Sequence, residues 1–239
     1  MHGADDDAIM DGLQSLSFML ETLAARFPAM PVRVGPSAIP ARASPLGSQP
    51  ASDGRQRVAL AKRDPRTRGL FGAAWLMGYV AQLASTDVRA ITLMHLQGDA
   101  GLLQGDDAPP VPAFFVLQAL KDAQEIEPIS GLPSGVCGVR YKSATQSYAL
   151  IANLRNKAVA MGVGLTSLGA KQAWVMNEES LRAGGVNPAA ASQCYPADET
   201  VVNAAGCISV WQPVNIDVHH DAKTESLQLT PYALLRVHT

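Results

Sequence analysis

The first half of the chain alternates helix-like and strand-like segments, and this alternation limits the fold more than any other feature. Asp5–Arg26 carries apolar residues at steps of three and four, which predicts an amphipathic helix. A short strand is expected at Val32–Ile39, ending near Val34 or Gly35. A helix then begins at Asp64-Pro65 and runs to about residue 85.

Two further segments complete this pattern. Val88–Leu96 is an almost continuous apolar run, typical of a parallel strand that is buried on both faces. Pro112–Gln124 is expected to be a helix. The alternation predicts βα units around a parallel sheet, but two parallel strands alone do not make a stable layer.

The pattern changes after Glu127-Pro128, where helical periodicity stops. Short β-rich runs then follow at intervals typical of a β-sandwich. We therefore predict two domains, residues 1–127 and 128–239. The runs are Val136–Tyr141, Ser147–Asn153, Ala158–Val163, Gln172–Met176, Gly206–Val210 and Leu227–Val237, with a possible further strand at Pro213–Val218.

Charge and composition exclude some classes of function. The formal net charge is −2 and no stretch is basic, which argues against a nucleic-acid partner. No apolar run approaches the roughly 18 residues that span a bilayer, so no membrane association is predicted. The acidic N-terminus is unlike a signal peptide, and we expect a cytoplasmic protein. The three cysteines match no zinc pattern and are interpreted as reduced thiols.

Four motifs carry a resemblance to a known family. They are His2-Gly3-Ala4-Asp5-Asp6-Asp7, Val34-Gly35-Pro36-Ser37, Arg63–Trp75 and Leu229–Val237. Together they resemble the D-apionate lactonase family, with Arg63–Trp75 as the most specific match. The resemblance implies a partial (β/α)8 TIM-type barrel followed by a small β-sandwich domain. It also implies hydrolysis of a sugar lactone, D-apionolactone, to the branched aldonic acid D-apionate, with no cofactor.

Length is where the sequence departs from that family. In a full-length relative, a front β domain and the first barrel strands would precede His2. The resemblance therefore implies a fragment, a truncated reading frame or one half of a split enzyme. A missing N-terminal barrel half or a second copy of the chain is the expected partner, and activity of this chain alone stays open.

Active sites of such barrels lie at the carboxyl ends of the strands, which directs attention to the N-terminal acidic segment. His2 and Asp5 are interpreted as a catalytic pair that activates water, and Asp6 as a substrate ligand. The competing interpretation is a terminal histidine followed by aspartates that cap a helix.

Arginines near the second helix suit the carbonyl chemistry of a lactonase. Arg66 is predicted to stabilise the developing oxyanion, and Arg42 and Asp64 to contact substrate. The alternative is a capped helix start with solvated arginines.

Ser37 and His95 complete the candidate set. Each follows a predicted strand, so both are expected at the same edge as substrate contacts, with a packed core histidine as the alternative for His95. No metal site is predicted, because neighbouring strand residues such as His219 and His220 point to opposite faces.

Two rival functions are kept beside the lactonase. A glycoside hydrolase of similar architecture needs paired carboxylates, yet Val32–Ile39 contains no Asp or Glu. A non-catalytic fragment or binding module is the other alternative. The β-rich half shows no catalytic constellation, and Trp174 and Trp211 are interpreted as core residues.

Overall fold

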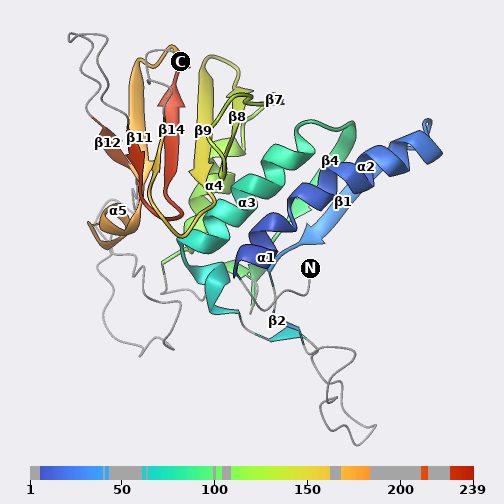
Figure 1. Ribbon diagram of the computed structural model, residues 1–239, viewed down its shortest axis with the longest axis horizontal. Coiled ribbons are helices and arrows are strands. Elements are labelled where there is room, and N and C mark those ends of the chain that lie inside the picture. The colour runs from blue at the N-terminus through green and yellow to red at the C-terminus, as the bar shows by residue number, and fades with distance from the viewer. Residues whose placement is uncertain are drawn as a thin grey trace, which may run out of the picture.

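The computed structural model describes residues 6–39, 41–42, 61–62, 64–98, 101–103, 109–161, 168–183, 211–214 and 227–239. Its longest helix lies between a two-stranded parallel sheet and a six-stranded antiparallel sheet (Figure 1). The central helix α3 (Leu70–Leu83) packs against α2 (Gln14–Arg26), α4 (Pro112–Leu120) and the larger sheet. The chain is thus a mixed α/β structure in which α3 joins the two halves.

The N-terminal half follows the predicted alternation with local differences. The first helix divides into α1 (Asp6–Asp11) and α2, with the break at Gly12-Leu13. The predicted helix at Asp64-Pro65 begins as the short 3-10 helix η1 (Pro65–Arg68) before α3. Helix α3 is buried along nearly its whole length, as its apolar sequence predicts.

The two predicted barrel strands pair in parallel. β1 (Val32–Ser37) lies beside β4 (Val88–Leu93). β1 extends to Ser37, beyond the end that we predicted near Gly35. The close approach of the strands requires glycine at position 35, where φ is 128° and a Cβ would overlap the carbonyl oxygen of Thr92.

The prediction that Val88–Leu96 is buried on both faces is wrong. Arg89–Thr92 are exposed, and Ile91 retains 37% of its accessible surface. The physical reason is that β4 has β1 as its one neighbouring strand among the described residues, so little covers it. The strand also stops at Leu93, because Met94 has a φ of 61° and turns the chain.

Short pairs of strands follow these elements. After Met94, β5 (His95–Gln97) pairs in parallel with β6 (Gly101–Leu103). Within the loop predicted for residues 40–63, β2 (Ala41–Arg42) pairs with β3 (Ala61–Lys62). The described residues contain no closed barrel.

The C-terminal half forms the six-stranded sheet, in the order β12-β11-β14-β9-β8-β7, with every pair antiparallel. A separate ladder pairs β10 with β13, and the predicted strand at 206–210 lies outside the described residues. The sandwich itself stays a prediction. The elements are β7 (Glu125–Pro128), β8 (Val136–Lys142), β9 (Ser147–Asn153), β10 (Val159–Ala160), β11 (Gln172–Met176), α5 (Glu178–Ala183), β12 (Gln212–Val214), β13 (Gln228–Leu229) and β14 (Leu234–His238).

Both faces of the central strands are buried. On β9 and β14, Leu150 and Leu234 belong to the core that includes α3, whereas Ile151 and Leu235 belong to a second core on the opposite face. This division follows the two-residue period of a strand. The first core crosses from α3 into the sheet, and β7 begins at Glu125, so the two-domain division at residue 127 stays a prediction.

Candidate active site

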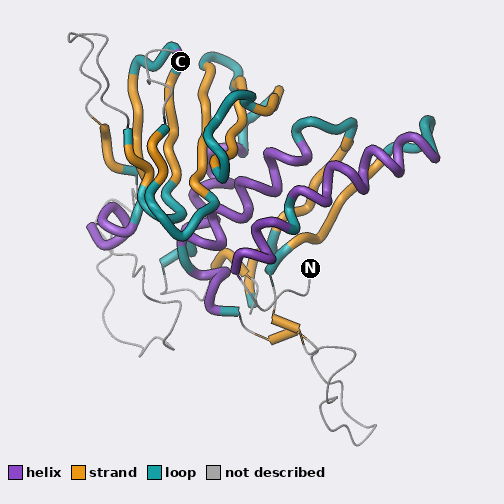
Figure 2. The backbone as a smooth tube through the Cα atoms, viewed as in Figure 1, coloured by secondary structure: helices purple, strands orange, loops and turns teal. Residues whose placement is uncertain are grey.

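The predicted active-site residues gather at one end of the parallel pair. The carboxyl ends of β1 and β4 lie at the same end of the molecule as the N-terminal ends of α1 and α3 (Figure 1). Figure 2 shows the same elements as a backbone tube, with the helices in purple and the strands in orange. Parallel βα units place their active-site loops on this side. We call it the carboxyl face.

Asp64 anchors the start of η1 at this face. Its side chain is 3% exposed, and Oδ1 accepts a hydrogen bond from the backbone N–H of Arg66 at 3.0 Å. The same carboxylate also binds the guanidinium, since Arg66 Nη2 lies 2.7 Å from Oδ2 and Nε lies 3.0 Å from Oδ1. Asp64 therefore caps the helix and forms a bidentate ion pair with Arg66.

Arg66 joins this buried carboxylate to an exposed one. Its Nη1 donates to Asp6 Oδ1 at 3.0 Å, across 60 residues of sequence. The hydrogen bonds that Arg66 donates to both carboxylates, with the bond to Asp64 the stronger, raise the pKa of Arg66 above its ordinary value, so the guanidinium stays charged. Because the Asp6 side chain is 50% exposed, the network presents an oriented carboxylate at the carboxyl face.

An aromatic pair borders this network, and the sequence analysis did not identify it. The guanidinium of Arg66 lies 5.7 Å from the centre of the Phe71 ring. Tyr232 packs edge-on against Phe71 with 5.2 Å between ring centres. Burial, and then the charges of Asp6 and Asp7, raise the pKa of the Tyr232 phenol.

Tyr232 comes from the far end of the chain. It has a φ of 55°, an uncommon backbone conformation for tyrosine. Neither composition nor periodicity marks this position. The only available signal was the Leu229–Val237 motif, which indicated family resemblance but no place at the site.

Ser37 lies at the end of β1, as predicted, but its hydroxyl already has a protein partner. Its Oγ lies 2.6 Å from the hydroxyl of Tyr79, which is 6% exposed and packs against Trp75. This bond ties the end of β1 to α3. A role for Ser37 in substrate binding stays a prediction.

The structure describes the remaining candidate residues to different extents. His95 follows β4 and is exposed, so it is not the packed core histidine that we kept as an alternative. Arg42 lies in β2, with only its backbone described. His2 and Asp5 lie outside the described residues, as do Cys194, Cys207 and His219-His220-Asp221.

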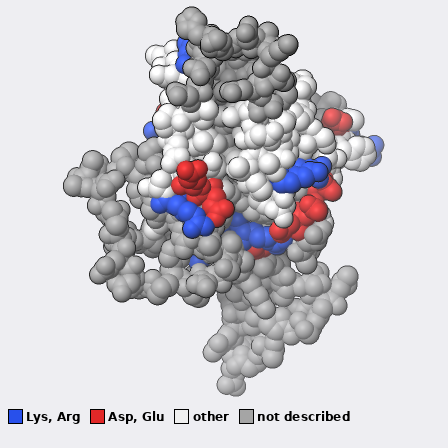
Figure 3. All heavy atoms as spheres, turned by 60° about the vertical axis from the view of Figure 1, so that its left-hand side comes forward, with Lys and Arg blue, Asp and Glu red and all other residues white. Residues whose placement is uncertain are grey.

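Neither the surface charge pattern nor the positions of possible metal ligands assign a role to further residues. On the face drawn in Figure 3, acidic and basic side chains lie next to one another instead of separating by sign. No group of three or more possible metal-binding side chains occurs in the described ranges. No helix in the same ranges has the length and apolar character needed to cross a membrane.

The parallel strands, the helices beside them and the polar carboxyl face define part of a (β/α)-barrel protein. Residues 1–125 match the family described as D-apionate lactonase, TIM barrel domain, and the chain belongs to this family. It is 32% identical over 126 residues to the D-apionate lactonase of Brucella anthropi. That match covers 50% of this chain and 21% of the relative, so the matched part spans about a fifth of the relative's length.

Proposed function

We propose that the carboxyl face takes part in the hydrolysis of a sugar lactone, with D-apionolactone as the substrate and D-apionate as the product. The observation that carries this proposal is the Asp6–Arg66–Asp64 network at the carboxyl ends of parallel strands. Family membership supports the choice of reaction. The Brucella anthropi relative bears the name of the same lactonase.

In this proposal Asp6 is the general base. Its carboxylate takes a proton from water as the water oxygen attacks the lactone carbonyl carbon. The bond between that carbon and the ring oxygen then breaks, and Asp6 returns the proton to the ring oxygen, which becomes a hydroxyl group of the acid product. Arg66 positions Asp6 through the 3.0 Å hydrogen bond, while Asp64 keeps Arg66 in place from the buried side. His2 and Asp5 precede Asp6 directly and stay the predicted alternative pair for activating water.

The same network disfavours the glycoside hydrolase alternative. A retaining glycosidase needs two carboxylates that both reach the substrate. Asp64 is 2% exposed, and both of its side-chain oxygens accept hydrogen bonds from Arg66. Asp64 therefore serves the fold and the orientation of Arg66, which leaves Asp6 as the accessible carboxylate of this trio.

We further propose that additional barrel strands complete the site. β1 and β4 pair only with each other among the described residues, so each has an edge that can accept another strand. Apolar side chains are also exposed in the N-terminal half, namely Ile91 on β4 and Phe18 and Met19 on α2, the last two 70% and 63% exposed. The strands come from further barrel sequence, in a longer chain or a partner.

A chimaera tests both proposals. Residues 1–125 replace the matched segment in the Brucella anthropi lactonase, and acid release from D-apionolactone is followed beside the unmodified 239-residue chain. We expect turnover by the chimaera and little by the chain alone. A folded chimaera with no rate above spontaneous hydrolysis would contradict the proposed function.

Point variants in the same chimaera test the role of Asp6. We expect Asp6→Asn to lower kcat by about 10²-fold to 10⁴-fold, the range for loss of a general base. Asp11→Asn is the matched control, since Asp11 lies on the same helix at 62% exposure and its ion-pair partner is Arg155. If Asp6→Asn turns over like Asp11→Asn, the base lies elsewhere, and His2→Ala and Asp5→Asn become the next variants.

A further inference from the structure

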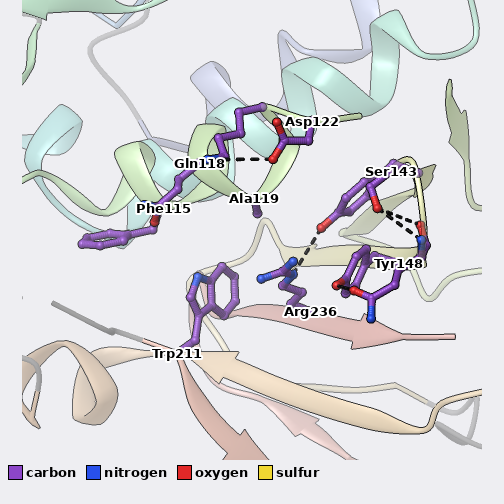
Figure 4. A pocket seen from close by; sticks show the side chains of 11 residues that line it. Phe115, Gln118, Ala119, Asp122, Ser143, Tyr148, Trp211 and Arg236 are labelled. Carbon is purple, nitrogen blue, oxygen red and sulfur yellow. Dashed lines mark hydrogen bonds and ion pairs between the residues drawn. The ribbon is translucent and has the colours of Figure 1, made fainter. Parts of the chain in front are cut away.

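A cavity lies between α4 and the six-stranded sheet, apart from the carboxyl face. It encloses about 400 Å³, within the range of small-molecule sites. None of its lining residues belongs to the Asp6–Arg66–Asp64 network. Figure 4 shows the side chains around it, from α4 on one side and the sheet on the other. Its lining residues include Phe115, Gln118, Tyr141, Tyr148, Trp211 and Arg236.

Arg236 provides a positive charge at this cavity. Its guanidinium lies 4.4 Å from the centre of the Tyr148 ring, and Nε donates to the hydroxyl of Tyr141 at 3.2 Å. No carboxylate in the described part of the chain forms an ion pair with Arg236. A half-buried guanidinium with aromatic neighbours and no ion-pair partner among the described residues favours an anionic ligand.

Aromatic surfaces adjoin this charge. Figure 4 shows Trp211 on one side of Arg236 and Tyr148 on the other. Phe115 lines the cavity from α4 and is 3% exposed. Flat apolar rings of this kind pack against the carbon–hydrogen face of a small ligand. Trp211 was predicted to be a core residue, and it packs half-buried against the first core while it also lines the cavity.

Uncharged polar groups line the rest of the cavity. Gln118 comes from α4, and Ser143 and Gln146 come from the turn between β8 and β9, where Tyr148 donates a hydrogen bond to Gln146. The acidic side chain at the cavity, Asp122, lies 3.8 Å from Lys121, so the two charges offset each other. Amides and hydroxyls suit a ligand with several hydroxyl groups.

We infer that this cavity binds a small polyhydroxylated carboxylic acid, the chemical class of aldonic acids. The carboxylate binds Arg236, the carbon chain lies against Trp211, and the hydroxyls bond to Gln118 and the Ser143–Gln146 turn. The inference rests on the cavity alone and not on the proposed hydrolysis at the carboxyl face. It assigns the C-terminal half a binding role that our sequence analysis did not predict.

Titration of the complete 239-residue chain with D-gluconate tests this inference, using calorimetry or protein NMR. We expect saturable binding of gluconate. D-Glucose lacks the carboxylate and acetate lacks the hydroxyls, so each should bind about ten-fold more weakly or worse, as expected when a charged hydrogen bond or its polar companions are missing. Equal binding of acetate and gluconate, or no saturable binding of gluconate, would overturn the inference.

Three variants test whether gluconate binds in this cavity. Gln118→Trp places a large side chain at an exposed position of α4 and should abolish gluconate binding by filling the cavity. Arg236→Gln should weaken gluconate about ten-fold and leave glucose unchanged, provided that thermal unfolding shows an intact fold. Arg140→Gln, at an exposed position of β8, is the matched charge control and should bind as wild type.

These outcomes are independent of the lactonase assay. Gluconate binding that survives Gln118→Trp would place the ligand elsewhere and contradict the inference. A chimaera without hydrolytic activity would remove the proposed reaction while leaving gluconate binding at Arg236 unaffected.

Discussion

The two principal sheets of this chain are covered in different ways. In the parallel pair β1–β4, four consecutive residues of β4 are exposed, and each strand has a single neighbour among the described residues. In the antiparallel sheet, β9 and β14 each lie between two strands, and their side chains enter cores on both faces. In the antiparallel sheet, β14 from the end of the chain pairs with both β9 and β11, so strands of the described chain cover one another. Parallel strands such as β1 and β4 need covering elements on both faces, and the described residues supply few of them.

The polar residues of the two regions also differ in their exposure to solvent. Near the parallel pair, Arg66 holds an exposed carboxylate in place, and this arrangement suits chemistry at a surface. In the antiparallel half, Asn153 is fully buried, and within the described part of the chain its side chain bonds to backbone groups. The following substitutions test this contrast, beginning with the largest expected effect.

The largest effect is expected from core truncation in the antiparallel sheet. Ile151→Ala should lower the free energy of unfolding by about 2–5 kcal/mol, because Ile151 is completely buried. Ile91→Ala, at 37% exposure in β4, should cost below about 1 kcal/mol. Urea unfolding of both variants measures the difference. Equal losses of unfolding free energy would contradict the proposed contrast between the two sheets.

The next effect concerns the buried polar anchor of the antiparallel half. Asn153 Nδ2 donates to the carbonyls of Lys157, Leu229 and Thr230 at 2.8, 3.1 and 3.0 Å. Asn153→Ala leaves these carbonyls without that donor and should cost about 2–3 kcal/mol. The exposed Asn156→Ala is the control in the same turn. Similar urea midpoints for the two variants would show that the anchor contributes little.

A smaller effect is expected at the anchor of the carboxyl face. Asp64→Ala removes the cap of η1 and the buried partner of Arg66, and should cost about 1–2 kcal/mol. Asp87→Ala, whose side chain is 86% exposed, should be nearly neutral. Thermal unfolding compares the two, and a neutral Asp64→Ala would mean that the network does not stabilise this face.

The smallest expected effect on stability tests the electrostatic link between the two halves. Asp6→Asn should change the free energy of unfolding by less than about 1 kcal/mol, because the pair with Arg66 is partly exposed. It should, however, lower the pKa of Tyr232, since burial raises that pKa first and the Asp6 charge raises it further. Absorbance of the tyrosinate during a pH titration measures the shift. If the pKa of Tyr232 is the same in Asp6→Asn as in the control Asp11→Asn, the charge of Asp6 does not act on Tyr232.

Sequence by itself determined the order of elements and the position of much of the candidate site. Three- and four-residue apolar steps identified α2, and the Asp64-Pro65 start signal identified the helical segment that contains η1 and α3. Short β-rich runs identified strands β8, β9 and β11. All of these signals are local. Asp6 was predicted at the active face because parallel barrel strands end on the same side. Asp64 and Arg66 were predicted as site residues because guanidinium groups suit a carboxylate or a developing oxyanion. The structure brings these three residues together, while their chemical roles stay predictions.

Tertiary structure decided what covers each element and which distant residues meet. An apolar run such as Val88–Leu96 specifies the side chains of a strand but not whether other strands cover it, so the burial prediction failed there. Tyr232 joins Phe71 near Asp6, and Arg236 meets Trp211 beside α4, through pairings between distant segments. Periodicity reports the apolar face of one element at a time, whereas such contacts depend on how the elements pack.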